Sequence, residues 1–269
     1  MAELPPPPEV RAAFGAQGDP VRLAGGKGGT WRVGDVVLKP SEGDDEVRWR
    51  AGVLHSLPRS PHFRVARPVR AADGDWIAGG WEATEAVAGQ PDQRRVDDVI
   101  RAGAAFHEAL TAVPRPAFLD TRQNPWAYGE WLAFEDESFP GQRRPSKLLD
   151  ELLELRRPVL SAEQIVHGDL LGNLLFADGR PPAVIDWPAY WRPPAWASAV
   201  AAIDAVVWHG VGPELLDRWA HLPEWDQMLV RAAIYRLGTW DAAGWSGEPE
   251  DAYHPVVEMC RTRVLGSGA

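Results

Sequence analysis

The 269-residue chain contains a single cysteine, Cys260, which excludes an internal disulfide framework and a cysteine-based metal cluster. Its first eight residues hold no apolar signal segment, and nowhere do roughly 18 apolar residues follow one another without interruption. We therefore expect a cytoplasmic protein with no membrane partner. Lysine and asparagine are also rare, and the few copies are Lys27, Lys39, Lys147, Asn124 and Asn173.

The net charge is −10, and basic residues occur in nothing longer than a pair or triplet. Because an acidic surface repels a phosphate backbone, we expect no nucleic-acid partner. Apolar residues make up 45% of the chain and charged residues 25%, values typical of globular proteins. The length suits one large or two small domains.

Apolar patterning divides the chain into three parts. Residues 1–20 contain four consecutive prolines and predict an extended, Pro-rich arm. Residues 21–88 predict a small N-terminal lobe with one helix beginning near Ser41 and five strands, at 21–23, 30–33, 36–39, 64–69 and 76–81. Residues 89–269 predict a larger lobe, mostly helical, with helices near 96–113, 146–156, 196–208, 213–220 and 224–237 and short apolar runs at 165–166, 174–176 and 183–185.

A glycine-rich turn separates the first two predicted strands, at Gly25-Gly26-Lys27-Gly28-Gly29-Thr30. It is not a Walker A loop, because Gly28 rather than Ser or Thr follows Lys27, and a strand rather than a helix comes next. The dinucleotide-binding fingerprint also needs a helix directly after its glycines, so the strand that follows here excludes that motif as well. A glycine hairpin whose amides fold over nucleotide phosphates remains, with a plain flexible hairpin as the alternative.

Lys39 ends the third predicted strand, close in sequence to this turn. An ammonium group there could reach the α- and β-phosphates of a nucleotide if a carboxylate on the following helix held it. Glu46 is our predicted partner, one turn into that helix, with Glu42 and Asp45 as rivals. The alternative is a solvent-exposed lysine at a strand end.

The most informative segment is Ile165-Val166-His167-Gly168-Asp169-Leu170-Leu171-Gly172-Asn173, followed by Ala183-Val184-Ile185-Asp186-Trp187. It predicts two loop ends side by side, on which Asp169, Asn173 and Asp186 converge. Phosphoryl transfer needs one carboxylate to deprotonate a hydroxyl and an oxygen-rich pair to hold a hard cation such as Mg²⁺. Alternatively, each motif is an ordinary turn or strand end, and we expect structural roles for His167 and for His107.

This segment resembles the catalytic core of aminoglycoside phosphotransferase-like kinases, and within that family an actinobacterial branch whose substrates are unassigned. The resemblance implies an α+β, protein-kinase-like bilobal fold with a five-stranded antiparallel N-lobe and a mostly helical C-lobe. It implies ATP and Mg²⁺ as cofactors and a small-molecule hydroxyl compound as acceptor.

By the same resemblance, Asp169 is the catalytic base, and Asn173 and Asp186 are the metal ligands. The nucleotide site then comprises Gly26, Lys27, Gly28, Gly29, Lys39, Glu46 and the hinge residues 82–87, with Glu82, Ala83 and Thr84. Asp204 would brace the catalytic loop. Trp187-Pro188 replaces the Phe-Gly pair of protein kinases and favours the small-molecule branch.

The acceptor is expected against the region after Trp187, where tryptophans alternate with acids: Trp191, Trp196, Trp208, Trp219, Trp225 and Trp240 with Glu214, Asp217, Glu224, Asp226 and Asp241. Such a set could bind an amino sugar, a sugar or an amino alcohol; the alternative is that the tryptophans pack helices and the acids are solvated.

Two other functions remain open. One is a catalytically silent nucleotide-binding pseudokinase, suggested by the Asp169–Asn173 spacing of four residues, one fewer than the family's usual five. The other is transfer of a nucleotidyl group to a protein.

Overall fold

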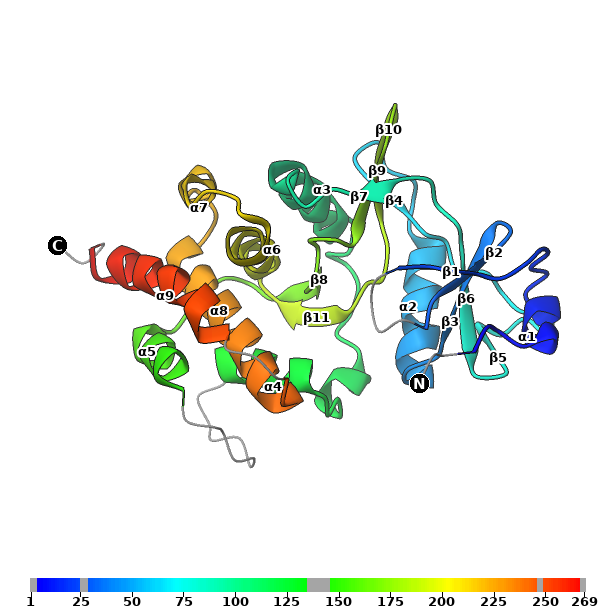
Figure 1. Cartoon of the computed structure of the whole chain (residues 1–269), viewed down its shortest axis with the longest axis horizontal. Helices are drawn as coiled ribbons and strands as arrows, with labels where there is room; N and C mark the ends of the chain where they lie inside the picture. The colour runs from blue at the N-terminus through cyan, green and yellow to red at the C-terminus, as the bar shows by residue number, and fades with distance from the viewer. Residues whose placement is uncertain (1–3, 25–28, 135–145, 246–248, 267–269) are drawn as a thin grey trace. The chain divides into compact units, whose positions relative to one another are not determined.

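The computed structural model describes residues 4–24, 29–134, 146–245 and 249–266. The chain forms two compact units, whose elements are labelled in Figure 1. Unit 1 consists of Met1–Pro91 and Leu174–Asp186, and unit 2 of Asp92–Asn173 and Trp187–Ala269. The boundary therefore crosses the segment that the sequence analysis singled out.

Unit 1 contains a five-stranded antiparallel sheet in the order β1-β2-β3-β6-β5, which confirms the predicted fold class. Its strands are β1 (Val21–Arg22), β2 (Trp31–Val33), β3 (Val36–Pro40), β5 (Ile77–Ala78) and β6 (Trp81–Glu85). The predicted strand at 76–81 is instead two strands, because Gly79 and Gly80 both adopt positive φ and turn the chain between them.

The predicted strand at 64–69 belongs to a second sheet of unit 1, in the order β4-β10-β9-β7. Its strands are β4 (Arg64–Val65), β7 (Gln90–Pro91), β9 (Leu174–Ala177) and β10 (Arg180–Val184). β4 pairs with β10 in parallel, although more than 100 residues separate them in sequence. No periodicity within 64–69 could have indicated that partner.

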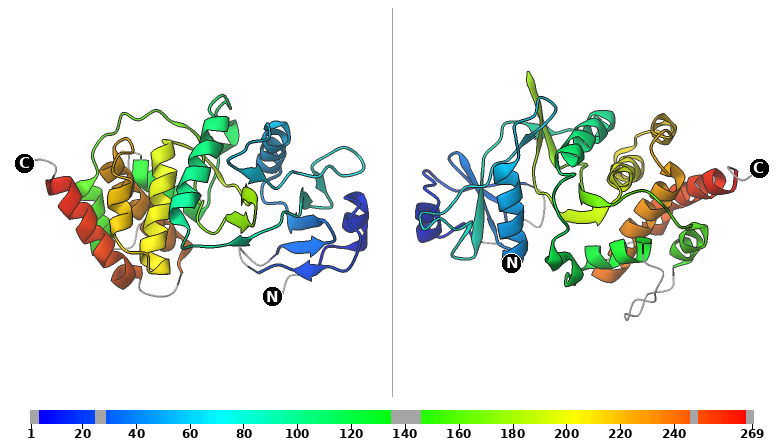
Figure 2. Two further views of the ribbon diagram at one scale, coloured as in Figure 1. Left: turned by 90° about the horizontal axis from the view of Figure 1, so that it is seen from above. Right: turned by 180° about the vertical axis from the view of Figure 1, so that it is seen from behind.

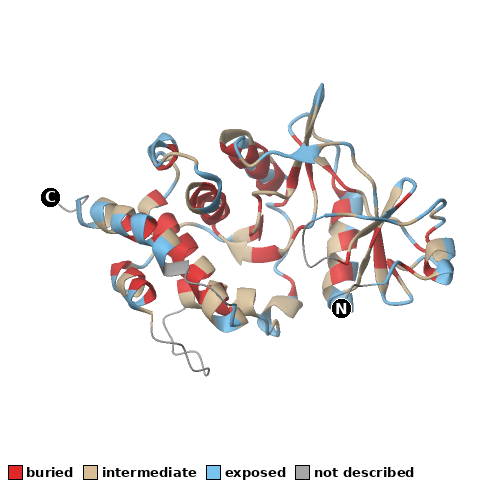
Figure 3. Ribbon diagram, in the orientation of Figure 1, coloured by how far each residue is buried: buried red, intermediate tan, exposed pale blue. Residues whose placement is uncertain are grey.

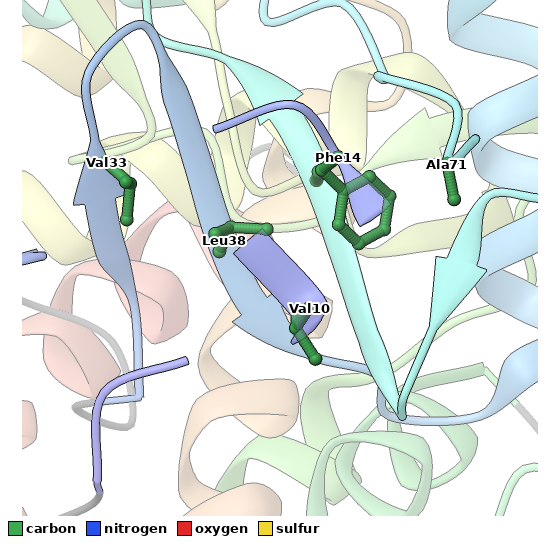
Figure 4. Close-up of a cluster of buried hydrophobic side chains, with 6 residues drawn as sticks. Val10, Phe14, Val33, Leu38 and Ala71 are labelled. Atoms are coloured by element: carbon green, nitrogen blue, oxygen red, sulfur yellow. The ribbon is translucent and has the colours of Figure 1, made fainter. Parts of the chain in front are cut away.

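The arm expected to be extended contains a short helix, α1 (Pro8–Ala13). Proline at the first helical position has no amide hydrogen to lose, so the preceding prolines do not prevent a helix here. Val10 and Phe14 lie one turn apart and are buried against Leu38 and Ala83 of the main sheet. Figure 4 shows both side chains directed at the strands, and this burial stabilises a helix too short to form alone.

The predicted helix after Ser41 is α2 (Asp44–Ser56). It buries Val47, Ala51 and Leu54, the stripe that the sequence indicated, and three acidic residues occupy its first turn, where the helix dipole favours negative charge.

Unit 2 is mostly helical, as Figure 2 shows from two sides. In its described residues the elements are α3 (Val96–Ala109), η1 (Ala117–Asp120), α4 (Pro125–Phe134), α5 (Lys147–Leu155), β8 (Gln164–His167), β11 (Ala189–Arg192), α6 (Pro194–His209), α7 (Glu214–Arg218), α8 (Trp225–Ala243) and α9 (Pro249–Gly266). The sequence predicted five of these helices. It missed α4, which carries no apolar stripe, and α9, which contains Pro255.

Helix α6 lies at the centre of unit 2. All residues from Ala195 to Ala205 are buried, as the red ribbon in Figure 3 shows. It packs against α3, α8 and α9, and its uniform burial accounts for its small-residue sequence. Among the described residues, no helix is both long and apolar enough to span a bilayer.

Two glycines allow α4 and α8 to approach closely. A Cβ atom added at Gly129 would lie 2.3 Å from the Tyr235 carbonyl oxygen, and one at Gly238 would lie 3.2 Å from the Gly129 Cα. We expect Gly129→Ala to destabilise the protein by about 1–3 kcal/mol in chemical denaturation, because a backbone atom cannot yield. The control Gly52→Ala, with no heavy atom within 4 Å, should instead stabilise helix α2 by up to about 1 kcal/mol. Equal effects of the two substitutions would contradict this packing.

Candidate functional site

The catalytic-loop candidate follows β8, the buried strand of unit 2 that pairs with β11. At its end the His167 amide donates to Nε2 of His107, at 3.0 Å, and Nδ1 of His167 accepts from the Asp169 amide, at 3.1 Å. Both histidines are buried. The structural roles expected for them are confirmed, since each imidazole holds the backbone of the loop.

Burial and the neighbouring His167 lower the pKa of His107 to about 3, from the usual 6.5. The unfolded chain therefore binds this proton between those pH values and the folded chain does not. We expect the free energy of unfolding to fall below pH 6.5 by up to about 1.4 kcal/mol per pH unit on this account. His107→Gln, which keeps an acceptor for the His167 amide, should flatten the slope when unfolding is measured from pH 4 to 7; an unchanged slope would exclude this source.

The carboxylate of Asp169 accepts hydrogen bonds at both oxygens. Nη2 of Arg236 donates to Oδ1 at 2.6 Å, and Nδ2 of Asn173 donates to Oδ2 at 3.1 Å. Nδ2 of the Asn173 side chain also donates to the backbone carbonyl oxygen of Asp169, at 2.7 Å. The side chain of Asp169 nevertheless remains 41% exposed. Its orientation is thus fixed while its carboxylate stays open to solvent.

Arg236, on α8, joins Asp169 to Asp204, on α6. Its Nε donates to Oδ1 of Asp204 at 2.9 Å, and its Nη2 donates to the other Asp204 oxygen. Burial raises the pKa of Asp204, although its ion pair with Arg236 acts to lower that pKa. Burial disfavours the charge of Arg236, but Asp204 and Asp169 outweigh it and hold its pKa well above the usual range. No sequence motif marks Arg236, which lies 67 positions beyond Asp169.

A pair of buried tyrosines, Tyr190 and Tyr235, lies next to the loop. Tyr190 on β11 and Tyr235 on α8 are buried, and their hydroxyls lie 3.0 Å apart. A Cβ atom at Gly168 would lie 2.3 Å from the Tyr190 ring, so only glycine fits between His167 and Asp169. The position of Asp169 therefore depends on the packing of β11 and α8.

In unit 1, Lys39 on β3 forms an ion pair with Asp186, which follows β10. Their Nζ and Oδ1 atoms are 2.5 Å apart. Asp186 adopts φ of +42°, a conformation that is uncommon for a residue other than glycine. Such strain persists only where the surroundings hold it, and it sets the direction in which the carboxylate projects.

Lys39 also lies 3.6 Å from Glu82, the residue opposite it on β6. Glu82 in turn accepts from Nη2 of Arg50, on α2, at 2.7 Å to each oxygen. Glu46, the predicted partner of Lys39, lies 4.0 Å from the Arg50 guanidinium; its pairing with Lys39 stays a prediction. Arg50 was missed because nothing in its spacing distinguishes it from other arginines.

Of the predicted glycine turn, Gly26, Lys27 and Gly28 fall outside the described residues, and Gly29 is buried beside β2. The predicted hinge residues Ala83 and Thr84 lie within β6, where Ala83 belongs to the core. A small cavity of about 20 Å³ adjoins Glu82, Ala83 and Thr84 on the side of α2. It has room for a water molecule and not for a base.

Most of the acids proposed to line the acceptor region already have partners. Glu224 accepts from the Leu160 and Ser161 amides, while Asp217 and Asp226 both pair with Arg263. Trp196 and Trp225 are buried in the core. The packing alternative is therefore confirmed for Trp196 and Trp225, whereas the three acids are bound by amides or by Arg263 rather than only solvated. Other aromatic rings follow one another from α4 to α9, namely Trp126, Trp245, Trp240, Trp208 and Tyr253.

The predicted metal ligands offer oxygen donors of the right kind. The Asn173 amide directs its nitrogen at Asp169, which leaves its oxygen as an acceptor. Asp186 offers a carboxylate. Amide and carboxylate oxygens suit Mg²⁺. Within the described part of the chain, no three His, Cys, Asp or Glu side chains cluster as a metal site of their own.

The sequence profile of the phosphotransferase enzyme family matches residues 17–240, most of the chain. This chain belongs to that family. A search of curated proteins found no match.

Several solved structures of phosphotransferases and kinases share the fold at low sequence identity. An aminoglycoside phosphotransferase from Alicyclobacillus acidocaldarius is 18% identical with a TM-score of 0.61, over 99% of this chain and 96% of that one. A thermostable mutant of the aminoglycoside phosphotransferase APH(4)-Ia, in complex with ADP and hygromycin B, is 15% identical with a TM-score of 0.61, over 97% and 98%. Choline kinase LicA from Streptococcus pneumoniae is 10% identical with a TM-score of 0.56, over 91% and 94%. The fold is thus the α+β, protein-kinase-like fold.

Proposed function

We propose that this protein is an ATP- and Mg²⁺-dependent kinase that transfers the γ-phosphate to a hydroxyl group of a small molecule. Membership of the phosphotransferase family supports this, as do solved relatives bound to ADP or named as choline kinase. Asp169 is the proposed base, whose carboxylate orients the acceptor hydroxyl and accepts its proton.

The observation that carries the proposal is the setting of Asp169. Arg236 and Asn173 hold its two oxygens, and yet 41% of its side chain is exposed. An aspartate that only stabilised the loop would gain nothing from that exposure. A carboxylate that must meet an acceptor hydroxyl needs both a fixed direction and an open face.

Unit 1 supplies the nucleotide side of the proposal. Lys39, paired with Asp186 in this structure, would exchange that partner for the phosphates of ATP. Asn173 and Asp186 would hold Mg²⁺, which screens the charge of the transferred group. The remaining residues proposed for the nucleotide site are Gly26, Lys27, Gly28, Gly29, Glu46, Glu82, Ala83 and Thr84.

The test is ATP turnover with Mg²⁺ against a panel of hydroxyl compounds, including neutral sugars, amino sugars, amino alcohols and hydroxy acids. The proposal requires ADP and a phosphorylated acceptor in equal amounts, detected by mass. If ATP raises the melting temperature but no compound is phosphorylated, the protein is a nucleotide-binding module. The Asp169–Asn173 spacing of four residues, one fewer than the family's usual five, is what suggests that alternative.

A further inference from the structure

Arg236 has hydrogen-bonding capacity that the described residues do not use. A guanidinium has five N–H donors. Nε and Nη2 of Arg236 bind Asp204 and Asp169, whereas no described residue accepts from Nη1. The side chain is only 15% exposed, and the same guanidinium touches the proposed base. Arg236 therefore presents an unpaired donor edge beside the carboxylate at which an acceptor hydroxyl would be placed.

The acids that could pair with a cationic acceptor are largely bound to other groups of the protein. One Asp169 oxygen and both Asp204 oxygens already bind Arg236. Three of the five acids proposed to line the acceptor region, Glu224, Asp217 and Asp226, bind backbone amides or Arg263. An ammonium placed beside Asp169 would thus also lie near the Arg236 guanidinium, whose like charge repels it.

A second arginine lies behind the same loop. The Arg122 guanidinium lies 5.2 Å from the centroid of the Tyr190 ring, and that ring packs against Gly168. The nearby Glu130 is paired with Arg192, at 2.8 Å. Arg122 thus places a positive charge near this side of the loop, beside the negative charges of Glu130 and Asp169.

We propose that Arg236 determines acceptor specificity by binding a carboxylate of the acceptor through Nη1, so that the substrates are hydroxy acids, sugar acids included, rather than amino sugars or amino alcohols. The inference rests on the proposed kinase function. An arginine donor edge binds a carboxylate strongly and directionally, and it would set the neighbouring hydroxyl against Asp169.

The experiment measures kcat/KM for three probes of one skeleton: glucuronate, glucose and glucosamine, with glycerate, glycerol and serinol as a second set. We expect the acid to exceed the neutral compound by roughly 10-fold to 100-fold, the range for a hydrogen bond to a charged group, and the amine to be lowest. Arg236→Gln should bring the acid-to-neutral ratio close to one, and Arg236→Lys should retain part of it. Arg101→Gln, at a surface arginine 66% exposed, should leave the ratio unchanged.

The ratio separates specificity from structure, because a purely structural role for Arg236 would lower all three values together. Turnover with glucose or glucosamine equal to or better than with glucuronate overturns the specificity inference alone. A ratio unchanged in both Arg236 variants, with melting temperatures near that of the parent protein, also overturns it. Absence of turnover with every probe, while ATP still raises the melting temperature, overturns the kinase proposal itself and with it this inference.

Discussion

Asp169→Asn should lower kcat by about 100-fold to 10,000-fold with little change in the KM for ATP. The substitution keeps the size of the side chain and an oxygen that can accept from Arg236, but it removes the group that accepts the hydroxyl proton. Lys39 and Asp186, proposed to contact the nucleotide and metal, belong to unit 1 and are not altered. Initial rates of ADP formation at saturating acceptor, with nucleotide binding measured separately, test this.

Asp178→Asn is a matched control, because Asp178 is an exposed carboxylate in the turn between β9 and β10. Its activity should equal that of the parent protein. Asp169→Asn should also fold normally, with its melting temperature within a few degrees of the parent's. Retention of more than a tenth of the activity would remove Asp169 from the role of base.

Glu82→Ala should destabilise the protein by about 3–5 kcal/mol, because it leaves the Arg50 guanidinium buried without its main counter-charge. Arg50 and Glu82 are 13% and 10% exposed, and both Glu82 oxygens lie 2.7 Å from Nη2 of Arg50. Desolvation lowers the pKa of Arg50, but Glu82, together with Glu46 and Asp186, outweighs it, so that the pKa is raised overall. Chemical denaturation measures the loss.

Two further variants identify the cause of the stability loss in Glu82→Ala. Glu85→Ala, at an exposed position on the same strand, should change the free energy of unfolding by no more than about 0.5 kcal/mol. The double variant Arg50→Met with Glu82→Leu should recover most of the stability, since a well-packed apolar pair can replace a buried ion pair. A loss below about 1 kcal/mol in Glu82→Ala alone would show that Glu46 or solvent compensates Arg50.

Local patterns predicted the elements whose burial repeats along the chain. Helices α2, α3 and α5 carry apolar residues on one face, and β8, β9 and β10 coincide with the short apolar runs. Patterns failed where burial came from elsewhere: α4 lies against α8 through Gly129, and α1 follows a run of prolines. Helices α4 and α1 are each stabilised by the surface on which they pack, α8 and the main sheet respectively, and their own sequences do not predict a helix.

The sequence by itself determined a strand-rich first part, a mostly helical second part and the short list of polar residues suited to phosphoryl transfer, because these depend on residue types and spacings of a few positions; the fold class came from the resemblance that its motifs carry. Only the tertiary structure decided which other side chains bind these polar residues and hold them in place. Arg236 reaches Asp169, Arg50 pairs with Glu82, and His107 supports His167, at separations of 32 to 67 residues. Such pairs form where packing removes water from charged and polar groups that lie far apart in sequence, and no periodicity records that proximity.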